Sequence, residues 1–152
     1  MRIVTARFGC IDVNEASVID APDGLLGFER CRRLVLLEDR PNSHFKWLQA
    51  VDHPEVAFIL INPMEFFSDY DVLLTDEQAD SLRLEDAADA VMFTTVTVAR
   101  DSEQVTTNLA GPIVINARIL RARQIVLDDE RYGSRHVVGE SPARRTQQPV
   151  TA

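Results

Sequence analysis

The chain has 152 residues, 45% hydrophobic and 26% charged, which is the composition of one soluble globular domain that buries about two thirds of its unfolded surface. Its net charge of −8 is concentrated in residues 51–100, which hold 11 Asp and Glu but only Arg83 and Arg100 as basic residues, so the rest of the chain carries +1. This distribution excludes the basic face that a nucleic-acid-binding protein needs for phosphates, and it favours a basic partner.

The N-terminal segment MRIVTARFGC lacks the apolar core and the cleavage-type ending of a signal peptide. No stretch of the chain approaches the roughly 18 apolar residues that span a bilayer. We therefore expect a cytoplasmic protein that does not associate with membranes. Cys10 and Cys31 form no CxxC motif, and both are expected to be reduced.

Strand patterns dominate the first half of the chain. Residues 2–8 alternate as a half-buried strand does, and residues 10–13 are expected to continue that strand past a bulge at Gly9. After the turn-rich segment APDGLLGFE, further strands are expected at 33–38, 45–50 and 56–61. The last of these is apolar throughout, which predicts that it is covered on both faces.

Residues 62–74 are expected to begin with an Asn-Pro turn and to end in a short strand. One helix is expected, over residues 75–83, because Thr75 and Gln78 have the spacing of a capping box. Asp76 and Glu77 follow the cap, where the helix dipole favours negative charge. The apolar stripe of this segment is narrow, so the helix is expected on the surface.

The second half returns to strands, at 91–98, 105–109, 112–115 and 123–127, with a hairpin connection between the last two. Eight to ten short strands, one short surface helix and no βαβ alternation predict an all-β fold, a small closed barrel or roll. We expect one domain over residues 1–138. Residues 139–152 are polar and contain prolines, so we expect a disordered tail.

The residue types that carry catalysis or bind metals form no recognisable motif. His44, His53 and His136 have no metal-ligand spacing, and the chain has neither a nucleophile elbow nor a glycine-rich phosphate loop. The acidic run 69–80 lacks the oxygen ligand, glycine and glutamate that a calcium loop requires at its fifth, sixth and twelfth positions. The arginines of RCRR (30–33) are expected to be solubilising edge residues rather than an RNA contact.

We therefore expect no enzymatic activity, no cofactor and no metal. The alternative is a carboxylate-based hydrolase that uses Asp69 and Asp71, although sequence does not supply the carboxylate separation that such chemistry needs. A further alternative is an oligomeric scaffold whose exposed strand edges pair with one another, whereas we expect a monomer.

The segment EFFSDYD (65–71) has the most unusual local composition. Its aromatic residues either belong to the core or form an aromatic anchor with an acidic rim, as protein interfaces do, and both interpretations can hold at once. Two asparagines that flank PIVI form a polar rim or act first as turn formers. The predicted partner-binding residues are Glu65, Phe66, Phe67, Asp69, Tyr70, Asp71, Asp76, Glu77, Asn108 and Asn116.

Three long segments, PDGLLGFE, WLQAVDHPEVAF and TNLAGPIVIN, occur in an order that closely resembles the FliW family of flagellar assembly factors. The resemblance extends over nearly all of residues 1–138. The chain departs from the family pattern at Asn62, where members commonly carry Asp, and at Ala87 and Ala117, which are often Pro. These differences are interpreted as adjustments of turns.

The resemblance implies a small β-barrel-like protein that binds other proteins and is not an enzyme. Members of this family bind CsrA, a small dimeric RNA-binding protein that represses translation of flagellin mRNA, and flagellin competes for the same factor. For this chain the resemblance implies the same two partners. The acidic stretch would either cover the RNA site of CsrA directly or dock beside it and antagonise at a distance, which is the version we favour.

Overall fold

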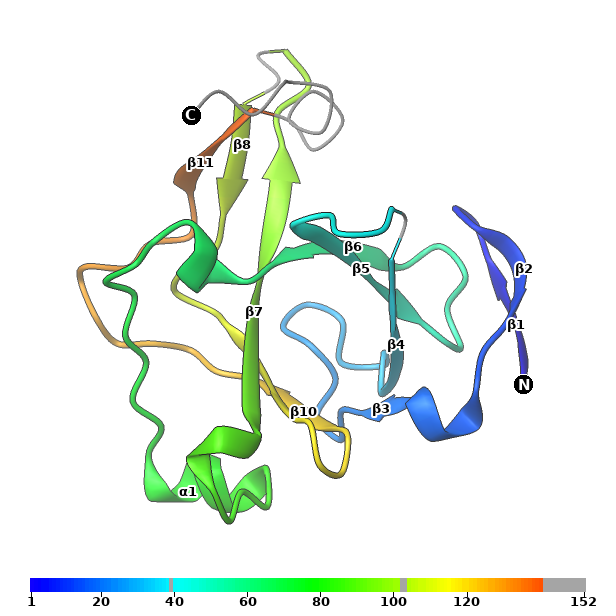
Figure 1. Cartoon of the computed structure of the whole chain (residues 1–152), viewed down its shortest axis with the longest axis horizontal. Coiled ribbons are helices and arrows are strands. Elements are labelled where there is room, and N and C mark those ends of the chain that lie inside the picture. The colour runs from blue at the N-terminus through cyan, green and yellow to red at the C-terminus, as the bar shows by residue number, and fades with distance from the viewer. Residues whose placement is uncertain (39, 102–103, 141–152) are drawn as a thin grey trace.

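The computed structural model describes residues 1–38, 40–101 and 104–140. Within them, nine strands form one sheet and two strands form a separate hairpin near the N-terminus (Figure 1). The strands are β1 (Arg2–Thr5), β2 (Gly9–Asp12), β3 (Ile19–Asp20), β4 (Arg33–Leu37), β5 (Phe45–Ala50), β6 (Ala57–Ile61), β7 (Ala90–Val98), β8 (Gln104–Thr107), β9 (Ile113–Asn116), β10 (Arg121–Gln124) and β11 (His136–Glu140).

The hydrogen bonds of the large sheet run in a ring. The strand order is β11-β8-β7-β6-β5-β4-β3-β10-β9, and β9 also pairs with β7, which closes the circuit. Strand β8 pairs with the second half of β7, and β11 pairs with β8. These two strands therefore extend the sheet away from the ring (Figure 1). The predicted all-β roll is confirmed.

Every strand of the ring contributes to the main hydrophobic core. Its members include Ile19, Leu34, Leu48, Leu60 and Ile113, all almost completely buried. Because side chains alternate along a strand, Val114 of β9 points the other way, into a second cluster with Leu82 and Ile125. The core therefore lies inside the ring, and a smaller cluster lies on its outer face.

The outer cluster is covered by the segment between β6 and β7. This segment contains the 3-10 turns η2 (Pro63–Glu65) and η3 (Ala87–Asp89) and the helix α1 (Asp76–Ser81). The predicted capping box of α1 is confirmed, since Thr75 accepts from the Gln78 amide and the Gln78 side chain accepts from the Thr75 amide. The segment supplies Leu82 to the cluster, and Leu74 and Leu84 pack against it.

Several boundaries differ from the prediction. Residues 10–13 do not continue the first strand, because Gly9 has φ +71° and turns the chain back, so β2 pairs antiparallel with β1. No strand is assigned to residues 71–74, which form an irregular connection. The strand expected at 123–127 is β10, which starts earlier because Leu120, at φ +55°, completes a short turn.

Two further expectations concern burial and the C-terminus. The prediction that β6 is covered on both faces holds at Leu60 and Ile61, whereas Phe58 and Ile59 are half-buried. Strand β11 includes residues 139 and 140, so the sheet runs two residues past the expected start of the tail. The remainder of that tail, residues 141–152, lies outside the described residues.

Candidate functional site

A groove of about 410 Å³ lies between the η2–α1 connection and the first half of β7. Most of its lining is apolar, and two of its side chains are well exposed, Met64 at 53% and Val91 at 40%. Leu73, which lies between two lining residues, is 83% exposed. The lining residues are Asn62, Met64, Asp71, Val72, Leu74, Ala87, Ala90, Val91, Met92, Phe93 and Val114.

Carboxylates occur in the segments that line this apolar surface. Asp71 is exposed and belongs to the lining. Asp86 caps η3 by accepting from the Ala88 amide at 2.9 Å, next to the lining residue Ala87. Arg118 lies 3.6 Å from Asp89 and 3.8 Å from Glu85. The groove is thus an apolar surface with one acidic lining residue, Asp71, and further carboxylates at and beside η3.

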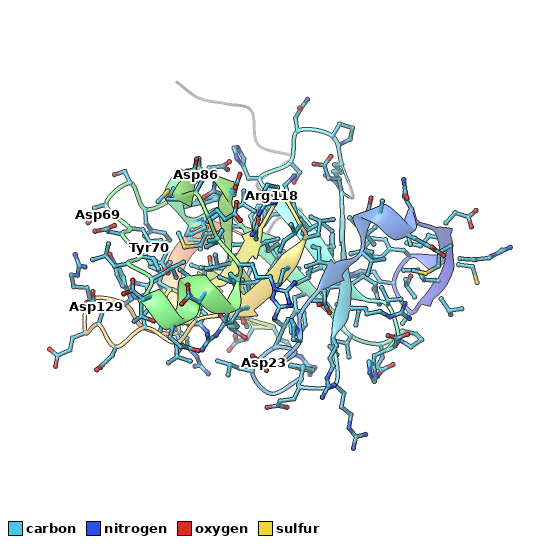
Figure 2. The ribbon with its side chains drawn as sticks, turned by 90° about the horizontal axis from the view of Figure 1, so that it is seen from below. Asp23, Asp69, Tyr70, Asp86, Arg118 and Asp129 are labelled. Carbon is cyan, nitrogen blue, oxygen red and sulfur yellow. The ribbon has the colours of Figure 1, made fainter. Side chains whose placement is uncertain are left out.

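Tyr70 holds the connection in place from beneath. Its side chain is 2% exposed, its hydroxyl donates to the Leu109 carbonyl at 2.6 Å, and its ring meets Tyr132 edge-on with centroids 4.7 Å apart. Burial raises the pKa of the Tyr70 hydroxyl well above its usual value. Figure 2 shows Tyr70, Asp69 and Asp129 at the same end of the molecule. Tyr70 is therefore an internal anchor, not part of the exposed surface.

The other members of EFFSDYD divide between surface and core. Glu65 is exposed and its carboxylate lies 2.7 Å from His44 Nδ1. Phe66 is half-buried beside Phe45, with ring centroids 6.3 Å apart. Phe67 is half-buried against His136 at 6.0 Å.

The two acids of the segment that the alternative hydrolase would use, Asp69 and Asp71, are both exposed. Asp71 alone of this pair lines the groove. Within the described part of the chain, no group of three or more His, Cys, Asp or Glu side chains is placed to hold a metal ion.

The four remaining predicted residues lie outside the groove lining. Asp76 and Glu77 are exposed in the first turn of α1, and Glu77 pairs with Arg123 at 3.0 Å. Asn108 is half-buried and accepts from the Ala110 amide at 3.0 Å, as a turn former does. Asn116 is fully buried, and its amide donates to the Leu82 and Arg83 carbonyls at 3.0 and 3.2 Å.

Asn116 therefore does not form an exposed rim. Its role is internal, because its side chain connects β9 to the end of α1. Most residues of the groove, among them Met64 and Val91, were not predicted from the sequence. The one available signal was the apolar content of NPMEFFSDYDVLL without strand alternation. Tyr132, which fixes the connection, was missed because its partners are more than 60 residues away.

Among the described residues, no helix is long and apolar enough to cross a membrane. The arrangement as a whole offers apolar surface beside negative charge, which suits the side chains of a protein partner.

Comparison with known proteins identifies the family. The profile of the FliW protein family matches residues 2–138. The chain is 42% identical over 144 residues to the flagellar assembly factor FliW of Geobacter sulfurreducens, covering 95% of this chain and 90% of that protein. It is 39% identical over 145 residues to the flagellar assembly factor FliW of Geotalea uraniireducens, covering 95% and 88%.

Comparison of the fold with solved structures points to the same family. A crystal structure of the flagellar assembly factor FliW superposes with a TM-score of 0.84 at 29% sequence identity, covering 93% of this chain and 99% of that one. Since the family profile and the relatives match nearly the whole domain, the chain belongs to the FliW family of flagellar assembly factors.

Proposed function

We propose that this flagellar assembly factor is a cytoplasmic, monomeric and non-enzymatic regulator that sequesters the translational repressor CsrA. Sequestration relieves repression of flagellin synthesis. Flagellin that accumulates in the cytoplasm binds the factor in its turn and sets CsrA free, so that export of flagellin controls its own production. Family membership supports this proposal, because the two partners are those that the resemblance implies.

The observation that carries the proposal is the groove lined by Met64, Val91 and Asp71, an apolar surface with carboxylates around it. All of its lining residues except Val114 lie in residues 51–100, the part of the chain that carries a net charge of −9. CsrA holds RNA phosphates and so must present basic surface. Opposite charges steer such a partner toward the groove, and the buried apolar contacts then hold it.

The proposal favours docking beside the RNA site of CsrA over direct coverage of that site. An acidic domain bound next to the RNA site repels RNA phosphates without occupying their positions. Titration of CsrA with this protein at several fixed RNA concentrations separates the two versions. A purely competitive pattern would contradict antagonism at a distance.

The decisive experiment is co-purification of the protein with CsrA from the same organism, repeated with flagellin added. We expect a complex with CsrA that flagellin dissolves, and a separate complex with flagellin. Light scattering on the free protein should give the mass of one chain. If neither partner forms a complex, the proposed function is wrong.

A further inference from the structure

The first half of β7 has an open edge. Strand β7 begins at Ala90, but its pairing with β6 covers only Thr94, Thr95 and Val96. Continuing the same register places Met92 opposite Pro63, where β6 has already ended and η2 begins. The edge of β7 before Thr94 is thus not covered by β6.

The direction of the peptide groups follows from the bonds on the other side of β7. The Thr95 carbonyl accepts from Asn108, and the Asp89 carbonyl accepts from Ala117, so odd-numbered residues bond toward β8 and β9. Because peptide groups alternate along a strand, the N–H and C=O of Met92 point to the side of β6.

Pro63 explains why these groups find no strand partner there. Proline has no N–H to donate to the Met92 carbonyl. The Pro63 carbonyl already accepts from Phe66 and Phe67, at 3.1 and 2.8 Å. Among the described residues, the main-chain N–H and C=O of Met92 make no hydrogen bond outside the pairings of β7 with its neighbouring strands.

The groove runs along this open edge. Residues 90–93 all belong to its lining, although side chains of successive strand residues point to opposite faces of the sheet. A cavity that contacts four successive residues of one strand borders the edge of that strand. Asp71 lines the same groove and is exposed.

We propose that the groove takes an extended segment of the partner, which adds to the edge of β7 and exchanges hydrogen bonds with the peptide groups of Met92. Its alternate apolar side chains enter the groove beside Met64 and Val91, and a flanking Lys or Arg pairs with Asp71. Strand addition to a free edge supplies main-chain bonds for affinity and pockets for specificity. The inference rests on the proposed function, since the partner is CsrA, and it specifies the conformation of the segment recognised.

The direct test is amide hydrogen exchange, followed by NMR on isotope-labelled protein with and without unlabelled CsrA. The Met92 amide should exchange faster than those of Val91 and Phe93 in the free protein, because those two residues bond to β9. In the complex, Met92 should slow by at least tenfold and show cross-strand contacts to CsrA protons. A complex that leaves the Met92 amide unchanged would overturn strand addition.

Substitution supplies a second test. Met92→Pro removes the N–H at an edge position, whereas Met92→Val keeps both peptide groups and an apolar side chain of strand type. We expect Met92→Pro to weaken CsrA binding roughly tenfold or more relative to Met92→Val, as loss of one or two hydrogen bonds predicts. Equal affinities in two folded variants would contradict the proposal. If Met92→Pro fails to fold, the exchange experiment decides alone, and if the unaltered protein binds no CsrA, it is the proposed function that fails.

Discussion

The phenolic oxygen of Tyr132 accepts a hydrogen bond from the backbone N–H of Asp71 at 3.0 Å, across 61 residues of sequence. The ring of Tyr132 also packs edge-on against Tyr70, whose own hydroxyl donates to the Leu109 carbonyl. Two tyrosines thus fix the position of Asp71, one from the surface and one from the interior. The shape of the groove depends on this pair.

Tyr132→Phe keeps the ring contact and removes the acceptor for the Asp71 amide. We expect a loss of about 0.5–1.5 kcal/mol in the free energy of unfolding, measured by denaturant titration. Tyr70→Phe is the comparison, because it leaves the buried Leu109 carbonyl without its donor and should cost more, about 1–3 kcal/mol. Unchanged stability and unchanged exchange of the Asp71 amide in Tyr132→Phe would show that this bond does not hold the connection.

Asn116 should matter for stability rather than for recognition. Asn116→Ala removes the donors to two carbonyls at the end of α1 and leaves them poorly satisfied, so we expect a loss of about 1–3 kcal/mol in the free energy of unfolding. Asn108→Ala, at a half-buried turn, is the matched control and should cost less. Thermal unfolding of both variants checks the ranking, and a reversed order would contradict the internal role of Asn116.

Charge reversal at the groove should weaken partner binding. Asp71→Lys places a cation among apolar residues that we expect to face a basic partner, so the affinity for CsrA should fall about tenfold or more at low salt. The loss should shrink as salt is raised, because screening weakens both attraction and repulsion. Asp12→Lys, on the N-terminal hairpin, makes the same change in net charge away from the groove. Equal losses in the two variants would indicate an effect of net charge alone.

The ion pair of Arg33 with Asp52 should give a small stability that depends on pH. A hydrogen bond from Arg33 holds the pKa of Asp52 below its usual value. A carboxylate with a lowered folded-state pKa stabilises the fold above the unfolded pKa of about 3.9, and the contribution disappears as the pH falls through the folded value.

Both side chains of this pair are about half exposed, so solvent screening limits the contribution to about 0.2–1 kcal/mol. Arg33→Gln should therefore be slightly less stable than the unaltered protein at pH 7, and the two should converge as the pH falls through the lowered folded-state pKa of Asp52. Chemical unfolding across this range measures the difference. A gap that persists at the acidic end would mean that Arg33 acts through packing and not through charge.

Local signals were sufficient for much of the fold. Residues 45–50 form β5 as predicted, because DRPNS and VDHPE break the chain on either side of them. Thr75 and Gln78 predicted the start of α1, since a capping box involves residues three apart. Two of the errors fall where one residue adopts an unusual backbone conformation, at Gly9 and at Leu120, which alternation of side chains does not report.

The groove could not be predicted from such local signals. Its lining comes from η2, the connection to α1, η3, β7 and β9, which meet only when the ring closes. Tyr70 and Asn116 were predicted to bind a partner, yet each is buried and donates a hydrogen bond to a carbonyl 39 or 34 residues away. The composition of EFFSDYD located the right region, and tertiary contacts then decided which of its side chains turn inward.

The closure of the ring between β3 and β10 has a consequence for synthesis of the chain. The two strands meet through the parallel pair Asp20 and Arg121, which are separated by most of the domain. Contacts so distant in sequence form slowly, after local hairpins such as β4–β5–β6. While the nascent chain is on the ribosome, the sheet stays open until β10 emerges, and its unpaired edges are available to chaperones or to misassembly in the meantime.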